Sequence, residues 1–531
     1  MTTGRTARAA PVAGKAIGTA ALILMAGNLS GSLLGSVRQI VMGDVFGATS
    51  QTSAFVAASI VPQMFYDLVI GAAISAALIP TFTEIRERRG LEALWRTVGS
   101  VMGLAWLVLI ALICVLFLGA RPLMDLILWG FQVKGVTRSL DLGVEMARVL
   151  VPSLFFLGTS AVLLASLYSL RRFAVPAFAP GLYHLGVIAG ALLLAGPLGI
   201  LALPVGALVG SVCQAGVQTA ALLRAHPHVR PRLELSPDVK RILRLYLPVA
   251  AGLLISIGGQ IIDIIFKSTL HDTGAIADML YATVLTQFPI GIAVAGLSFA
   301  VLPSISADAA LQRMDRYKDT LAAGIRLALF LTIPAAIGYL TLSVPIVSLL
   351  YQHHHFTHHD TLQTAAALTG YAIQIPFVGL DQMLIFSFYA RKDTLTPMLV
   401  GVVCVGIYVA AALLLKPGLQ ILGLALANTI QNSVHGLILL ALLFSTIGGL
   451  YNRGIVRSVL SSLVAGAGMG AVAVGLATWI GRAYPGGGFG HQSLDALVPV
   501  VAGACVYVGL AHLLRSDELT FVMAMLPRRR A

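Results

Sequence analysis

An oppositely charged pair stands near the end of a long apolar run in this chain. The run opens at Leu247, and its later part, IIDIIFKSTL (261–270), carries Asp263 and Lys267. Because these residues are four positions apart, a helix would place both on one face, where they can neutralise each other. Two roles remain open. The pair can be a structural device that lowers the cost of burying charge, or Lys267 can face an anionic ligand in a cavity while Asp263 holds it in place.

Six further ionisable residues stand within apolar runs or at their ends. Such residues are costly in a membrane unless they face a polar cavity or a partner, although long side chains near an end can reach the interface. They are Arg38, Asp67, Glu145, Arg148, Arg326 and Asp381. Arg38, flanked by SLLGSV and QIVMG, lies deep in its segment and is the strongest candidate for a cation that faces a cavity. Arg148 and Arg326 can simply extend to an interface.

The composition indicates an integral membrane protein. The chain of 531 residues is 58% hydrophobic and 11% charged, with a mean hydropathy of +0.90, which lies outside the range of soluble domains. Fourteen apolar runs can each cross a hydrocarbon core about 30 Å thick. They lie near 14–42, 52–80, 97–119, 140–168, 176–196, 200–223, 245–270, 277–304, 320–351, 362–390, 396–415, 419–446, 454–481 and 492–514. We therefore expect an all-α membrane protein with about fourteen transmembrane helices.

The basic residues follow the connections between these spans. Clusters such as Arg86 to Arg89, or Arg171 with Arg172, occupy every second connection and the carboxyl tail, whereas the alternate connections hold few. By the positive-inside rule, we expect both termini to be cytoplasmic. The net charge of +13 is therefore distributed over short loops, and no nucleic-acid partner is expected. We expect no removable signal peptide, since the first span serves as an anchor.

The two halves of the chain have similar proline-containing segments at corresponding positions. AALIPTFTEI (76–85) closes the second span, and FAVLPSISAD (299–308) closes the eighth. Matching prolines are separated by nearly constant offsets: 223 from Pro80 to Pro303, 224 from Pro152 to Pro376, and 221 from Pro176 to Pro397. A six-span repeat begins and ends on the same side, so the halves should be parallel repeats forming two six-helix lobes. The expected domains are 1–228, 229–450 and, with the last two spans and a basic tail, 451–531.

Other residue types give no sign of catalysis or of a cofactor. The histidines of QHHHFTHHDT (352–361) could bind a transition metal, but their spacing matches no defined site, and a solvated or pH-sensitive loop is the alternative. The four cysteines lie in separate spans without metal or redox spacing. Nucleotide-binding and hydrolase motifs are absent from the sequence, so transport would need a gradient or a membrane potential. We expect no metal and no cofactor.

Five segments resemble a known family. They are SLLGSVRQIVMGDVFGATSQTSAF (32–55), RRFAVPAFAPGLYHLG (171–186), VLPSIS (301–306), FTHHDTLQTAAAL (356–368) and FYARKDTLTP (388–397). They resemble the lipid II flippase family, the MurJ or MviN group of the multidrug/oligosaccharidyl-lipid/polysaccharide exporter superfamily. The resemblance implies a non-enzymatic transporter in the bacterial cytoplasmic (inner) membrane. By alternating access, it would move a polyprenyl-diphosphate-linked peptidoglycan precursor from the inner to the outer leaflet, with the last two helices forming a groove for the lipid tail.

The chain departs from that family's pattern at several charged positions. Uncharged residues stand there instead: Ser32, Gln39, Ser53, Tyr66, Ile264, Val284 and Gln287. Arg38 matches a retained arginine, and Lys267, three positions after Ile264, would restore one positive charge near the same helical face. We therefore predict substrate contacts at Arg38, Lys267, Asp263, Gln287 and Ser53, with Lys267 as a hypothetical substitute for the missing arginine. Two cations can attract a diphosphate, but less firmly than an arginine cluster; sodium coupling finds no support in the eleventh span.

Three other functions remain open on the sequence. A related exporter of another small molecule would rely on acidic cavity residues, which are scarce here. A non-transporting membrane scaffold of envelope biosynthesis would tolerate loss of Arg38 and Lys267. A membrane glycosyltransferase would need a catalytic carboxylate, for which Asp67 and Asp381 are the nearest options. The expected partners are a lipid-linked glycan precursor and membrane lipids, with cell-wall synthesis enzymes as a further class.

Overall fold

The structure is a computed structural model that describes residues 9–66, 77–224, 230–451, 453–484, 486 and 488–525. Every regular element within these ranges is a helix, which confirms the all-helical fold class. The physical reason is the solvent: a chain in hydrocarbon must satisfy its backbone N–H and C=O groups internally, and a helix does so within each segment.

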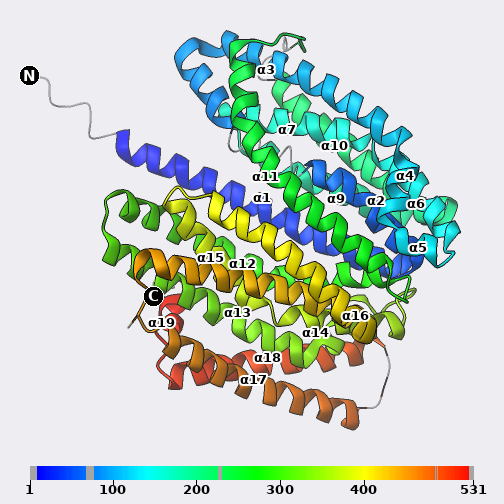
Figure 1. Cartoon of the computed structure of the whole chain (residues 1–531), viewed down its shortest axis with the longest axis vertical. Coiled ribbons are helices and arrows are strands. Elements are labelled where there is room, and N and C mark those ends of the chain that lie inside the picture. Colours follow the sequence, from blue (N-terminus) through cyan, green and yellow to red (C-terminus); the bar gives the residue numbers. More distant parts are fainter. Residues whose placement is uncertain are drawn as a thin grey trace, which may run out of the picture. The chain divides into compact units, whose positions relative to one another are not determined.

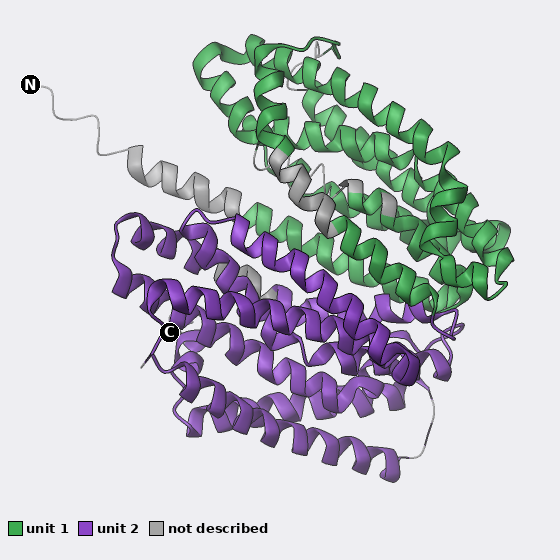
Figure 2. Cartoon of the chain, in the orientation of Figure 1, with its two compact units in different colours: residues 1–269 green, residues 270–531 purple. Residues whose placement is uncertain are grey.

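The chain divides into two compact units, Met1–Thr269 and Leu270–Ala531 (Figure 2). This boundary, defined by contacts, follows α11, whereas the sequence repeat places a boundary near residue 228. The predicted repeat domains therefore stay a prediction. The helices of unit 1 are α1 (Ala9–Phe46), α2 (Ser50–Tyr66), α3 (Ile79–Leu118), α4 (Ala120–Ile127), α5 (Trp129–Val133), α6 (Thr137–Leu150), α7 (Ser153–Ser169), α8 (Ala174–Phe178), α9 (Pro180–Leu198), α10 (Ala202–Leu223) and α11 (Pro237–Ser268) (Figure 1).

Unit 2 begins at Leu270 and holds the remaining helices. They are α12 (Ala275–Ala310), α13 (Met314–Tyr351), α14 (His358–Ala372), α15 (Ile375–Ala390), α16 (Leu395–Ile447), α17 (Ile455–Ala483), α18 (Phe489–Leu513) and α19 (Asp517–Met525). The long α16 turns back on itself at Gln420, where φ is +50°. His435 in its second limb consequently reaches the carbonyl of Pro397 in its first turn, at 3.3 Å.

Each predicted span corresponds to helical structure in the described residues, although residues 67–76 of the second span lie outside them. Within those residues, seven stretches are long and apolar enough to cross a membrane, or eight if the bent pair α14 and α15 is one span. Two of the seven, Ala174–Leu223 and Leu395–Ile447, contain two predicted spans each. The connection between the second and third spans is itself helical, because α3 begins at Ile79 and is interrupted only at Gly90, with φ +84°.

Two predicted spans are broken at matching prolines. Pro152 separates α6 from α7, and Pro376 opens α15 after a 45° bend from α14. Proline removes a backbone donor and crowds the preceding turn, so both sites favour a break. Pro62 and Pro289 instead lie inside continuous helices. Of these four prolines, Pro376 stands at the 45° bend, whereas α6 and α7 on either side of Pro152 together form one stretch, Thr137–Ser169, that is long enough to cross a membrane.

Each unit has its own apolar core. In unit 1, α3 contributes Phe82 and Leu94 to a cluster with Ala161 and Leu163 of α7. In unit 2, Tyr317, Met383 and Leu443 belong to a cluster drawn from α12, α13, α15 and α16. The last two spans pack against α13 of this unit, where Phe330 forms a smaller apolar cluster with Met469 of α17 and Tyr507 of α18. The Tyr507 hydroxyl also donates to the Phe330 carbonyl at 2.8 Å.

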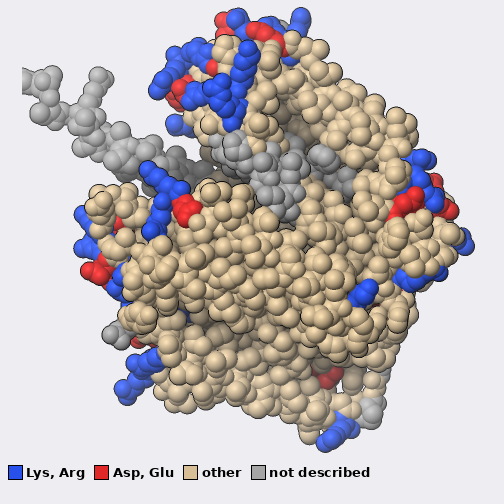
Figure 3. All heavy atoms as spheres, viewed as in Figure 1, with Lys and Arg blue, Asp and Glu red and all other residues tan. Residues whose placement is uncertain are grey.

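The charged side chains gather near the helix ends. In Figure 3, Lys, Arg, Asp and Glu lie mainly towards the edges of the displayed face of unit 2, and the surface between them is almost uncharged. Exposed leucines and valines such as Leu414, at 80%, and Val403, at 59%, cover the helices of this unit. A surface of this kind is stable in contact with lipid tails and would aggregate in water.

Candidate functional site

Asp263 and Lys267 form an ion pair on α11. Lys267 Nζ lies 2.6 Å from Asp263 Oδ2, and the two side chains are 11% and 24% exposed. The helix therefore places both residues on one face, as their spacing predicts. The geometry accounts for their burial without a ligand, and their predicted role in substrate binding stays a prediction.

The end of α11 that carries this pair is held against α5. Ser268 accepts a hydrogen bond from the Gly130 N–H through its Oγ, at 3.0 Å. The backbone of Ser268 approaches Gly130 so closely that a Cβ at this glycine would clash with it. Lys267, the preceding residue, is consequently fixed in position relative to the core of unit 1.

Arg38 lies partly buried on α1, beside α9. Its guanidinium is close enough to Tyr183 and His184 of α9 to interact electrostatically with both. Gly35, one turn earlier, leaves space for the His184 ring, because a Cβ there would lie 3.6 Å from His184 Cε1. No carboxylate lies within ion-pair distance of Arg38 in the described residues. No described acid therefore neutralises its charge, which leaves the guanidinium available to an anionic ligand.

Ser53 and Gln287 lie in different surroundings. Ser53, on α2, is 0% exposed and offers no surface to a ligand in this conformation. Gln287, on α12 of unit 2, is exposed. Neither residue's predicted contact with substrate is tested by these positions.

Three of the other ionisable residues from the sequence have identified surroundings. Arg148 lies over the Phe117 ring, 5.8 Å from its centroid, and Glu145 on the same helix is exposed. Arg326 of α13 faces Glu518 of α19, with Nε 3.5 Å from Oε1. Both arginines therefore have structural partners. Asp67 lies outside the described residues.

Asp381 lies in a group of mostly buried polar residues that was not predicted from the sequence. Its Oδ1 lies 2.7 Å from His435 Nδ1, and each side chain is 15% exposed. Nearby, Asn432 donates to Gln374 Oε1 at 2.7 Å and to Asn428 Oδ1 at 3.2 Å. The sequence feature that could have identified this group is the spacing of Asn428, Asn432 and His435, because it places three polar side chains on one face of an apolar helix.

Asp278 is a second acid missing from the sequence candidates. It is 1% exposed, and its Oδ1 accepts a hydrogen bond from the Thr364 hydroxyl at 2.9 Å. The other oxygen, Oδ2, has no hydrogen-bond partner in the described residues. The acid stands in the first turn of α12, where the positive end of the helix dipole favours it.

The histidine-rich loop is organised by capping and pairing. Thr357 and Asp360 form a capping box at the start of α14, so the Asp360 carboxylate is occupied by the Thr357 backbone N–H. His359 Nε2 lies 2.7 Å from Asp272 Oδ2. In the part of the chain that the structure describes, no three His, Cys, Asp or Glu side chains converge as a metal would require.

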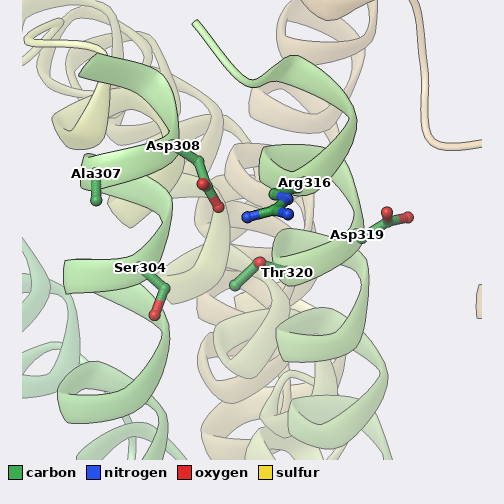
Figure 4. A pocket seen from close by; sticks show the side chains of 6 residues that line it. All are labelled: Ser304, Ala307, Asp308, Arg316, Asp319 and Thr320. Atoms are coloured by element: carbon green, nitrogen blue, oxygen red, sulfur yellow. The ribbon is translucent and has the colours of Figure 1, made fainter. Parts of the chain in front are cut away.

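A pocket of about 450 Å³ opens between the end of α12 and the start of α13. It is lined by Ser304, Ala307, Asp308, Arg316, Asp319 and Thr320. Asp308 and Arg316 point towards each other, while Asp319 points away (Figure 4) and pairs with Arg453. Because Asp308 balances the single cation, this pocket offers no excess positive charge for a diphosphate.

Lys267 and Arg38 of unit 1 are both partly buried cations, and their surroundings differ. Lys267 is balanced by Asp263, whereas Arg38 lies near the Tyr183 and His184 rings of α9. Charge-assisted hydrogen bonds strengthen in poorly hydrated sites, and guanidinium engages phosphate oxygens bidentately. The arrangement can bind an anion and carries no apparatus for making or breaking covalent bonds.

The sequence matches the family described as "Lipid II flippase MurJ" over residues 42–487. A "Probable lipid II flippase MurJ" of Bdellovibrio bacteriovorus is 26% identical over 507 residues, covering 94% of this chain and 95% of the relative. A "Lipid II flippase MurJ" of Burkholderia cenocepacia is 26% identical, covering 92% and 95%.

Solved structures share the fold. "Lipid II flippase MurJ, inward closed conformation" superposes with a TM-score of 0.77 at 21% identity, over 93% of this chain and 99% of that one. An inward-facing multidrug resistance transporter of the MATE family and MOP superfamily gives 0.65 at 16% identity, over 79% and 95%. Because the matched residues 42–487 extend through both units, the chain belongs to the lipid II flippase MurJ family.

Proposed function

We infer that this chain is a membrane transporter that moves lipid II, a polyprenyl-diphosphate-linked cell-wall precursor, across the membrane. The observation that carries this conclusion is the family match over residues 42–487, which extends across both compact units. The chain is a multi-pass protein of the inner membrane and is a flippase rather than an enzyme. Its substrate is a lipid-linked precursor.

The direction of insertion follows from the charge pattern. The basic connections alternate along the chain, and we propose that they and both termini lie in the cytoplasm. Lipid II would then be loaded from the inner leaflet, where its headgroup meets the basic side, and released at the outer leaflet. Two six-helix repeats moving against each other would provide alternating access.

Arg38 is our proposed principal contact for the diphosphate. It is partly buried, close to two aromatic rings, and without a paired carboxylate among the described residues. We propose Lys267 as the second cation, held by Asp263 until the diphosphate competes for it. Gln287 and Ser53 remain proposed neutral contacts that act in other conformations of the transport cycle.

Growth of a depleted bacterium tests the proposed function. A strain whose own lipid II flippase can be switched off is supplied with this chain, with Arg38→Ala, or with Arg96→Ala as a matched control, because Arg96 is exposed on α3. We expect the native chain and the control to restore growth and Arg38→Ala to fail at equal membrane abundance. Failure of the well-expressed native chain would instead favour a different exported molecule or a scaffold.

A further inference from the structure

The pair of Asp381 and His435 in unit 2 has no role in the diphosphate site proposed above. It joins three helical segments: α15 carries Asp381, the second limb of α16 carries His435, and the first turn of α16 carries Pro397. His435 Nδ1 lies 2.7 Å from Asp381 Oδ1, and His435 Nε2 lies 3.3 Å from the Pro397 carbonyl oxygen. Both ring nitrogens therefore face oxygen atoms.

If both contacts are hydrogen bonds, they specify how many protons the group holds. A carbonyl oxygen only accepts hydrogen bonds, so the Nε2 contact requires a hydrogen on Nε2. The contact between Nδ1 and Oδ1 requires a second hydrogen, carried either by the imidazole or by the carboxyl group. The pair thus holds one proton more than a neutral histidine beside an ionised aspartate. That proton belongs to the pair rather than to one residue.

Electrostatics in the membrane favours the same state. With the extra proton bound, the pair carries no net charge; without it, a negative charge remains on two side chains that are each 15% exposed. An uncompensated buried charge is costly in a span. Among the described residues, the thiol of Cys404 is another titratable group close enough to Asp381 to interact with it electrostatically. Cys404 lies on the first limb of α16 and is 1% exposed.

We propose that Asp381 and His435 form a proton-binding site within unit 2, and that binding and release of this proton are coupled to the helix movements of transport. Release leaves a lone pair on Nδ1 against the carboxylate, or on Nε2 against the Pro397 carbonyl. Either arrangement is repulsive and opens one of the contacts between α15 and the two limbs of α16. A proton gradient can then bias two arrangements of these helices, because they bind the proton unequally. The second half of this proposal rests on the proposed lipid II transport.

The proton site is tested without lipid II. Full-length protein in lipid nanodiscs, labelled with ¹⁵N-histidine, reports by solid-state NMR whether each ring nitrogen carries a hydrogen, and ¹³C-aspartate reports the carboxyl state. His435→Gln assigns the signal. If His435→Gln does not fold, the His435 signal can be assigned in His359→Gln protein instead. In that variant the similar pair of His359 and Asp272 is absent, so the histidine signal that shows contact with an aspartate belongs to His435.

We expect His435 and Asp381 together to hold the extra proton at about pH 6 and to release it on titration, with Asp381→Asn changing the His435 signal. A neutral His435 beside an ionised Asp381 throughout the range of about pH 5 to 8 would overturn the proposal. This result would stand whether or not the protein moves lipid II.

Coupling is tested by the pH dependence of lipid II translocation in vesicles. One coupled proton makes the rate change by up to about tenfold per pH unit. We expect His435→Gln to flatten that profile, and the matched control His359→Gln to retain it. His359 makes a contact of the same 2.7 Å length but is 64% exposed. A His435→Gln profile identical to that of the native chain would refute coupling, whereas absence of native transport at every pH would refute the proposed function and leave the NMR result intact.

Discussion

At the scale of single residues, the ion pair on α11 can be separated into structural and functional parts. Lys267 and Asp263 are mostly buried, at 11% and 24% exposure. Removing one partner takes the opposite charge away from a mostly buried ionised group, whereas removing both removes the two charges together. This difference distinguishes a pair that only stabilises α11 from one that also serves a ligand.

We predict that Lys267→Met lowers the free energy of unfolding by about 1–3 kcal/mol, and that adding Asp263→Leu recovers most of this loss. Lipid II translocation should stay impaired in the double variant, because the cation is still missing. Thermal unfolding in detergent and vesicle transport measure the two effects. Lys240 is exposed on the same helix, so Lys240→Ala should alter neither thermal stability nor transport. Normal transport by the stable double variant would leave Lys267 with a purely structural role.

The guanidinium geometry of Arg38 gives a second prediction at this scale. Arg38→Lys keeps the charge but loses bidentate contact with a phosphate. We expect Arg38→Lys to reduce the translocation rate by about tenfold and Arg38→Ala by more, with little change in thermal stability, since Arg38 has no ion pair to lose among the described residues. Equal rates for Lys and Ala would show that its charge does not bind substrate.

At the scale of elements, close glycine contacts set the distance between α9 and α10. A Cβ on Gly210 would lie 2.9 Å from Tyr183 Cα and 2.8 Å from the Leu182 carbonyl oxygen. Tyr183 and its neighbour His184 adjoin Arg38, so this helix contact positions the surroundings of the proposed diphosphate contact.

We predict that Gly210→Ala forces α9 away from α10 and destabilises the protein by about 1–3 kcal/mol, as overpacking does. Transport should fall with it. Gly216→Ala on the same helix is the control, because no atom lies within 4 Å of its Cβ position. Equal unfolding temperatures for the two variants would show that the helices accommodate the methyl group without moving.

The start of α16 offers a prediction on pH. Hydrogen bonds from the Thr396 N–H, at 3.0 Å, and the Thr396 hydroxyl, at 2.7 Å, lower the pKa of Asp393 in the preceding loop. A lowered pKa in the folded state means that the ionised form stabilises the fold above the ordinary value near 3.9, and that this contribution is lost as the pH falls below it towards the folded-state pKa.

Asp393→Ala should therefore cost about 1 kcal/mol at pH 6, as loss of a capping side chain does. The difference in unfolding temperature between the two proteins should shrink as the pH falls below about 3.9. A difference that stays constant across this range would mean that the carboxylate charge contributes nothing to the start of α16.

The sequence predicted the helical spans better than it predicted which side chains meet in the candidate site. Hydropathy identified the spans, because each span is read from contiguous residues, and the four-residue spacing of Asp263 and Lys267 predicted their pair. The contact between Asp381 and His435 joins positions 54 apart in the chain. Arg38 and Tyr183 likewise lie on different helices. Such neighbours depend on how helices pack, which hydropathy does not specify. The helical course of residues 79–89 was missed because charged residues indicated a loop.

At the scale of the whole molecule, the family match over residues 42–487 extends through both compact units. The charged residues retained by this chain are fewer than those of the family pattern that it resembles. On our proposal, Arg38 and Lys267 supply the attraction for the diphosphate. Because so few cations are available to bind a diphosphate, the identity of the transported substrate is the property most worth measuring.

The most direct test is translocation of lipid II by purified protein in sealed vesicles, with the lipid accessible to a membrane-impermeant reagent only after it reaches the outer leaflet. We expect the native chain to move lipid II faster than it crosses protein-free vesicles, and Arg38→Ala to lose this activity. A native protein that is folded, inserted and unable to move lipid II would show that lipid II is not its substrate.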